Sequence, residues 1–197
     1  MATYTTLPEP GKFYHIFNRG INGCDLFREQ DNYYHFLRLY EKYLNPVAET
    51  YAWCLMRNHF HLLIQVREVK QISPENNTSR NPVSQSFSNL FNAYTKAVNK
   101  RYHRTGSLFE KNFHRVEVST ETYLRNLVVY IHNNPVHHGF CDNLLDYPWS
   151  SYGTILSLSH TKLQRPEVIG WFDDKANFIE VHKRYPDARL IEKIIIE

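Results

Sequence analysis

Residues Glu49–Val66 read ETYAWCLMRNHFHLLIQV, and this segment carries the clearest strand pattern of the chain. Two runs rich in aromatic and β-branched residues, Glu49–Met56 and Phe60–Val66, flank the polar pair Arg57 and Asn58. Runs of this composition joined by a short polar connection are typical of a β-hairpin. We therefore predict two adjacent antiparallel strands in this part of the chain.

Strand and helix patterns alternate on both sides of this hairpin. Aromatic and β-branched alternation indicates strands, and apolar residues repeated at spacings of three and four indicate amphipathic helices. The order strand, helix, strand, strand, helix, strand is the split βαβ, or ferredoxin-like, arrangement. It predicts an α+β fold with an antiparallel central sheet and helices mainly on one face, plus an added helix after the last strand. Besides the hairpin, the expected elements are strands at Lys12–Arg19 and Phe113–Val118 and helices at Gln30–Leu44, Phe87–Tyr102 and Glu121–Asn133, the last ended by Pro135 and Gly139.

The bulk composition bounds the class of protein. Hydrophobic residues make up 42% of the 197 residues and aromatic residues 15%, which is ample for a packed core and excludes a disordered chain. We expect one domain over 1–152, a flexible polar loop at about 68–84, and an accessory segment at 153–197 packed on the domain. No apolar run is long enough for a membrane span and no secretory signal is visible, so we expect a cytoplasmic protein. Three widely spaced cysteines are expected to be free thiols.

His59 and His61 are separated by one residue within the second strand of the hairpin. On a strand this spacing points both imidazoles to one face and Phe60 to the other. Two neutral imidazoles with an added oxygen ligand suit a divalent cation that polarises a phosphate oxygen. A chain with 11 histidines also contains such pairs by chance, so the spacing alone leaves a purely structural role open.

Tyr130 and Asn134 lie four residues apart in the last predicted helix, so a phenol and an amide project from roughly the same face. A tyrosine can act as a covalent nucleophile that preserves phosphodiester bond energy in a phosphotyrosine. The chain has 14 tyrosines, and one flanked by valine and isoleucine is also typical of a core position. Periodicity alone therefore does not assign a catalytic role to Tyr130.

The net charge of +3 is mild, but the cations are concentrated in 96–115, where six of them face the single carboxylate Glu110. Aromatic residues are interleaved with these cations, a combination that suits phosphate neutralisation together with stacking of unpaired bases. A solvated helix face beside core aromatics would give the same pattern. The cations of this stretch are Lys96, Lys100, Arg101, Arg104, Lys111 and Arg115.

Taken together, these segments resemble the single-tyrosine HUH transposase superfamily, the insertion-sequence type, and within it the REP-associated tyrosine transposase branch. The segment LMRNHFHLL at Leu55–Leu63 is similar to the HUH strand, with Arg57 where proline is usual. The segment NAYTKAVNKRYHRTGSLFEKNFHRVEV at Asn92–Val118 is similar to the stretch from the basic helix to the final strand. The segments YLRNLVVYIHNNPV at Tyr123–Val136 and DYPWSSY at Asp146–Tyr152 are similar to the tyrosine helix and its tail. The resemblance covers about Phe13 to Tyr152, with the motifs in the family's order.

The resemblance implies a metal-dependent transesterase that cleaves and rejoins single-stranded DNA near hairpins through a 5′-phosphotyrosine. Carried over by position, Tyr130 is the nucleophile, and His59, His61 and Asn134 hold Mg²⁺ or Mn²⁺. Insertion-sequence members often have glutamine where Asn134 stands. Single-stranded DNA with hairpin structure is the expected partner, and the protein is expected to act at the bacterial nucleoid as a monomer or homodimer. The expected DNA-contacting residues are Arg19, Lys96, Lys100, Arg101, Arg104, Lys111 and Arg115.

Three other classes of function fit parts of the same pattern. A domesticated relative would bind hairpin nucleic acid without cutting it, which intact histidines and tyrosine argue against. A metal-dependent phosphohydrolase would use the histidine pair to activate water and keep Tyr130 as core. A structural zinc protein is disfavoured because the cysteines are not clustered.

Overall fold

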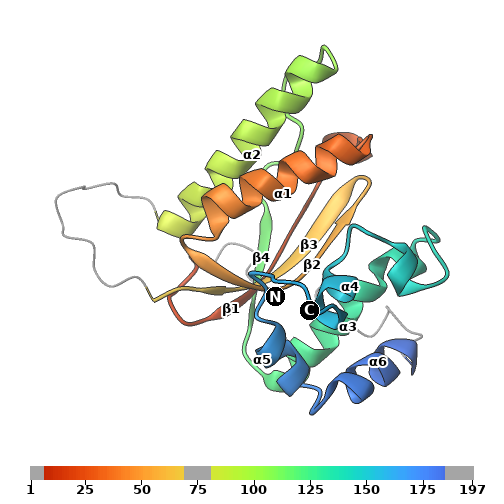
Figure 1. Cartoon of the computed structure of the whole chain (residues 1–197). Helices are drawn as coiled ribbons and strands as arrows, with labels where there is room; N and C mark the ends of the chain where they lie inside the picture. Colours follow the sequence, from red (N-terminus) through yellow and green to blue (C-terminus); the bar gives the residue numbers. More distant parts are fainter. Residues whose placement is uncertain (1–6, 69–80, 185–197) are drawn as a thin grey trace.

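The computed structural model describes residues 7–68 and 81–184 (Figure 1). Most of the loop predicted at about 68–84 lies outside the described residues. Its last part does not: helix α2 (Pro82–Arg101) begins at Pro82, five residues before the predicted start. The Asn81 side chain accepts hydrogen bonds from the N–H groups of Val83 and Ser84, and proline at the first helical position is preset for a helix, so the cap overrides the polar composition.

A four-stranded antiparallel sheet with the order β2-β3-β1-β4 forms the centre of the molecule. The two-residue turn at Arg57 and Asn58 joins β2 to β3, as the hairpin pattern predicted, and Met56 pairs with His59 across it. The sheet and its helices confirm the α+β class and the antiparallel sheet. The strands are β1 (Phe13–Arg19), β2 (Ala48–Met56), β3 (His59–Val66) and β4 (His114–Val118).

Alternate residues of each strand face two separate cores. Helix α1 (Gln30–Leu44) and α2 cover one face, where their apolar stripes pack on strand residues such as Tyr14, Phe60 and Leu62. The opposite face carries the side chains of His15, His59 and His61. Because strand side chains alternate with a period of two, the imidazoles lie on the face that α1 and α2 leave open.

Helix α3 (Glu121–His137) and the C-terminal helices cover this second face, so helices lie on both faces of the sheet and not mainly on one (Figure 1). The expectation of helices mainly on one face holds only for α1 and α2. The apolar sides of the later helices need the second face for burial. The remaining elements are α4 (Ser151–Leu156), α5 (Arg165–Gly170), α6 (Lys175–Arg184) and two short 3-10 turns at Ile21–Gly23 and Leu144–Asp146.

Helix α3 also runs further than predicted. Pro135 lies inside it, and the helix ends only before Gly139, whose φ of +68° is the left-handed conformation typical of helix ends. A proline inside a helix removes one backbone donor and crowds the carbonyl four residues before it, so the burial of α3 on the second face has to offset this cost. The extension places the His138 ring beside His59, on the second face of the sheet. The boundary predicted at residue 152 falls within α4, and the division of the chain there stays a prediction.

The three cysteines are free thiols, as expected. None of the helices in the described part of the chain has the length and apolarity that crossing a bilayer requires.

Candidate active site

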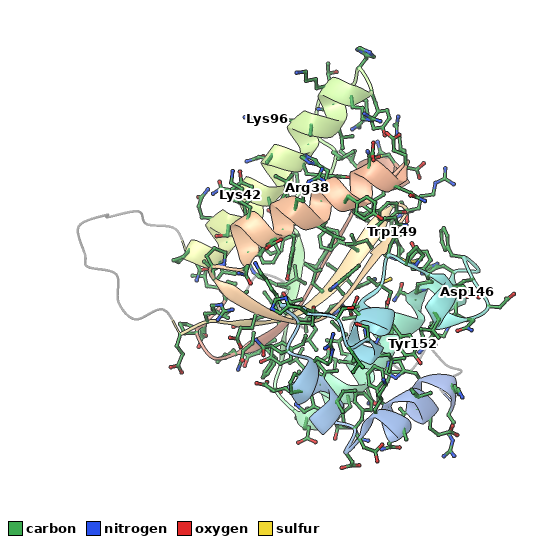
Figure 2. All side chains as sticks on the ribbon, in the orientation of Figure 1. Arg38, Lys42, Lys96, Asp146, Trp149 and Tyr152 are labelled. Atoms are coloured by element: carbon green, nitrogen blue, oxygen red, sulfur yellow. The ribbon has the colours of Figure 1, made fainter. Side chains whose placement is uncertain are left out.

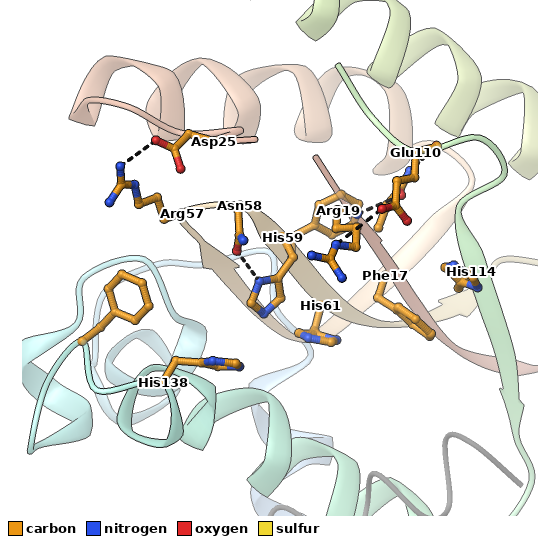
Figure 3. A pocket seen from close by; sticks show the side chains of 13 residues that line it. Phe17, Arg19, Asp25, Arg57, Asn58, His59, His61, Glu110, His114 and His138 are labelled. Atoms are coloured by element: carbon orange, nitrogen blue, oxygen red, sulfur yellow. Dashed lines mark hydrogen bonds and ion pairs between the residues drawn. The ribbon is translucent and has the colours of Figure 1, made fainter. Parts of the chain in front are cut away.

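A cavity of about 740 Å³ opens at the ends of β1 and β3, on the face of the sheet that carries the histidines. His59, His61 and His138 form its centre, and Phe17 and His114 extend it toward β4 (Figure 3). Two ion pairs lie at its rim: Arg57 with Asp25 at 2.8 Å, and Arg19 with Glu110 at 3.5 Å. The cavity is therefore lined by imidazole, amide and guanidinium groups together with two carboxylates and the rings of Phe17, Phe60 and Phe140.

The His59 ring lies between two amide oxygens. Asn58 Oδ1 lies 2.8 Å from His59 Nδ1, and Asn134 Oδ1 lies 3.3 Å from His59 Nε2. Burial lowers the pKa of His59 to about 4, so the ring is neutral near pH 7 and has one N–H to donate. The shorter contact favours the Nδ1–H tautomer. The Nε2 lone pair and the Asn134 oxygen then face each other with no hydrogen between them, and both lone pairs are available to a cation.

His61 is held in a similar way by a histidine of the neighbouring strand. His15 Nε2 lies 3.0 Å from His61 Nδ1, and the two rings are stacked with centroids 5.2 Å apart. Burial lowers the pKa of His15 to about 3 and that of His61 well below its usual value, with smaller contributions from neighbouring histidines. Both rings are neutral near pH 7. Two tautomer arrangements satisfy this contact, and the one in which His61 Nδ1–H donates to His15 Nε2 leaves the Nε2 lone pair of His61 available for a cation.

Tyr130 packs directly against this pair. Its ring lies 5.3 Å from the His61 ring and 6.4 Å from the His15 ring, edge to face in both cases. Only 9% of Tyr130 is exposed, and it lies beside the histidines, not among the described side chains that line the cavity. Helix α3 thus brings the predicted tyrosine and Asn134 to the same face of the sheet as His59 and His61, across about 70 residues of sequence.

The predicted DNA-contacting cations do not form one patch. Arg19 lies at the rim of the cavity, whereas Lys96 is on α2, in the helix layer of the opposite face (Figure 2). Arg101 forms ion pairs with Glu29 and Asp31 of the α1 region. Of the other four, Lys100 and Lys111 are exposed to solvent, whereas the two arginines contact other residues of the chain. Arg104 donates hydrogen bonds to Asn99 and Ser107. Arg115 donates to Ser84 Oγ and lies over the Phe113 ring.

Four residues of the site were missed by sequence reasoning. Asn58 stands next to His59 in the turn, and this adjacency was a usable signal. His15 reaches His61 only through the pairing of β1 with β3, and His114 reaches Phe17 only through the pairing of β1 with β4, where the two rings stack at 4.8 Å. His138 reaches His59 because α3 continues past Pro135.

Comparison with known families gives an independent result. The family described as "Transposase IS200 like" matches residues 14–134, well over half of the chain. The chain belongs to this family. The match runs from β1 into α3, so it includes His59, His61, Tyr130 and Asn134. The resemblance seen in the sequence is thereby confirmed at the level of the family.

Two further proteins are similar to this member of the IS200-like family. A Haemophilus influenzae protein described as a candidate REP-associated tyrosine transposase is 26% identical over 113 residues, which cover 53% of this chain and 58% of that protein. The chain thus matches somewhat more than half of that relative's length. A solved structure of a REP-associated tyrosine transposase bound to a REP hairpin aligns with a TM-score of 0.63 and 18% identity, over 79% of this chain and 86% of the other. This second likeness concerns the fold.

Proposed function

We propose that this chain is a metal-dependent transesterase that cleaves and rejoins single-stranded DNA near hairpins through a 5′-phosphotyrosine at Tyr130. The observation that carries the proposal is the convergence of Tyr130 and Asn134, from α3, on His59 and His61, from β3. Membership of the IS200-like transposase family supports the same chemistry.

The donor set fits a hard or borderline divalent cation. His59 Nε2 and His61 Nε2 would supply two neutral nitrogens and Asn134 Oδ1 one oxygen, and Asn58 and His15 hold the other nitrogen of each ring. Such outer hydrogen bonds fix the tautomer and the ring orientation of ligating histidines. Within the described residues no three His, Cys, Asp or Glu side chains converge as a metal site. The third protein donor in this proposal would be the Asn134 amide oxygen, which lies 3.3 Å from His59 Nε2. A bound Mg²⁺ or Mn²⁺ would polarise a phosphate oxygen and stabilise negative charge that develops on it.

In the proposed reaction the Tyr130 phenol oxygen attacks the phosphorus of a phosphodiester. The bond from phosphorus to the tyrosine oxygen forms as the bond to the 3′ oxygen breaks, and the phenol proton ends on the released 3′-hydroxyl. The reverse attack by a 3′-hydroxyl restores a phosphodiester and frees Tyr130, so no other energy source is required. Because Tyr130 is 9% exposed, DNA has to open space beside His61 for its phosphate.

We further propose two zones of DNA contact. Arg19, at the rim of the cavity, would contact phosphates close to the cleaved bond, where its partner Glu110 orients the guanidinium. The phosphates further from the cleaved bond would be contacted by a second set of cations, which lie away from the cavity. This set comprises Lys96, Lys100, Arg101, Arg104, Lys111 and Arg115.

Incubation with hairpin-bearing single-stranded oligonucleotides from the DNA that flanks the gene tests the proposal, with Mg²⁺ or with EDTA. We expect a protein–DNA adduct that survives denaturation, requires the metal, and is absent from Tyr130→Phe but present in Tyr123→Phe, a matched change on the same helix. An adduct with Tyr130→Phe contradicts the proposal. Cleavage without any adduct would identify a phosphohydrolase, and binding without cleavage a binding module.

A further inference from the structure

The face of α3 that points away from His59 carries a second polar cluster, which is fully buried and unrelated to the cavity. His132 of α3 lies between Ser151, at the start of α4, and His182, near the end of α6. His132 and Ser151 have no exposed surface, and His182 has 2%. Buried polar groups are costly unless every donor and acceptor is matched, so the pattern of hydrogen bonds is informative.

The hydrogen bonds of this cluster run in a single direction. The Phe178 carbonyl can only accept, so His182 carries its hydrogen on Nδ1 and donates to that carbonyl at 2.7 Å. His182 Nε2 therefore accepts from His132 Nδ1–H at 2.9 Å, and His132 Nε2 accepts from the Ser151 hydroxyl at 2.8 Å. Ser151 Oγ accepts in turn from the Trp53 N–H of β2 at 2.9 Å.

Each member of this chain donates once and accepts once, so both imidazoles are neutral and each has one allowed tautomer. A second contact follows the same path, because Asn133 Nδ2 reaches the His182 carbonyl at 3.5 Å. This series of hydrogen bonds joins four separate elements, β2, α4, α3 and α6, through His132. Helix α3 is consequently fixed between the sheet on one side and the C-terminal helices on the other.

We propose that Ser151, His132 and His182 are positioning residues for the active site, because they set how close α3 holds Tyr130 and Asn134 to the histidines of β3. This inference rests on the proposed function of Tyr130. His132 lies between Tyr130 and Asn134 in sequence and on the opposite side of the helix, so a shift or roll of α3 at His132 moves both. The C-terminal helices thereby contribute to the placement of Tyr130 and Asn134.

Kinetics of adduct formation test this role in Ser151→Ala, His132→Gln and His182→Phe, with Ile155→Val as the control. Ile155 is a buried apolar residue of the same helix α4 and takes no part in the hydrogen-bonded chain. Since a misplacement of about 1 Å can cost about a hundredfold in rate, we expect the rate at saturating oligonucleotide to fall by about ten- to a hundredfold. The KM for the oligonucleotide should change by less than about twofold, because the DNA-contacting cations are untouched.

Three results would overturn the inference: rates equal to those of Ile155→Val at matched denaturation midpoints, a rise in KM at unchanged rate, or nitrogen-15 NMR that shows either imidazole as the Nε2–H tautomer. Ser151→Thr keeps the hydroxyl, and we expect it to restore the rate. Failure of wild-type protein to form any adduct contradicts the proposed function instead. In that case the NMR assignment still tests the hydrogen-bonded chain by itself.

Discussion

Replacement of Asn58 by alanine tests how the site prepares His59 for a cation. In the wild-type chain two amide oxygens compete for the one N–H of a neutral His59, Asn58 Oδ1 at 2.8 Å and Asn134 Oδ1 at 3.3 Å. Without Asn58 the proton is expected to move to Nε2, which then donates to Asn134. The nitrogen and the oxygen proposed as metal donors would both be occupied by this hydrogen bond.

The expected loss of metal affinity follows from that competition. Restoring the tautomer that can bind a cation costs about the net value of one hydrogen bond, roughly 0.5–1.5 kcal/mol. This corresponds to about two- to twelvefold in affinity, since about 1.4 kcal/mol is a factor of ten. Loss of ring orientation adds to it, so we expect Asn58→Ala to weaken Mn²⁺ binding by about tenfold or more.

Titration of the DNA-free protein with Mn²⁺, followed by calorimetry or electron paramagnetic resonance, measures this effect. Asn58→Asp retains an oxygen acceptor for His59 Nδ1 and should bind Mn²⁺ at least as well as wild type. Arg57→Ala is the control, because it changes the other residue of the turn and removes only the ion pair with Asp25; it should bind Mn²⁺ with wild-type affinity. The reasoning is refuted if Asn58→Ala binds Mn²⁺ with wild-type affinity while His59→Ala does not bind it.

Three further predictions concern stability and DNA binding. Burial lowers the pKa of His182 to about 4, so on acidification the unfolded chain binds a proton at this residue before the folded chain does. The contribution of His182 to stability is therefore complete above about pH 6.5 and is lost toward pH 4. In urea titrations the free energy of unfolding of wild type should fall by about 1.4 kcal/mol more than that of His182→Gln between about pH 7.5 and 5.5. Phe60→Ala removes a fully buried ring and should lower the free energy of unfolding by about 3–5 kcal/mol; a loss below about 1 kcal/mol in chemical denaturation would contradict the packing described. The double change Lys96→Ala with Lys100→Ala should reduce the salt dependence of oligonucleotide binding, log K against log salt, by about 1.4, and an unchanged slope would remove both lysines from the interface.

The sheet and its two covering helices could be predicted because local pattern determines them. Helix α1 occupies the predicted range Gln30–Leu44, and β2 and β3 begin within one residue of prediction. Errors occurred where a specific contact overrides composition. The Asn81 cap starts α2 inside a polar stretch, and packing on the second face carries α3 past Pro135.

The candidate site was predictable only where its members are neighbours in sequence. His59 with His61, and Tyr130 with Asn134, follow from the periods of a strand and a helix. His15 is 46 residues from its partner His61, and no local period can report a pairing between strands. The contact of His132 with His182 depends in the same way on the packing of α6 against α3, 50 residues apart in sequence.

Mass spectrometry of the adduct identifies the side chain that attacks the DNA. After reaction with a hairpin-bearing oligonucleotide in Mg²⁺, nuclease trimming and proteolysis, the account predicts one modified peptide, with a 5′-phosphonucleotide on the Tyr130 phenol oxygen. A nucleotide attached to any other side chain, or cleaved DNA with Tyr130 unmodified throughout the time course, would contradict it.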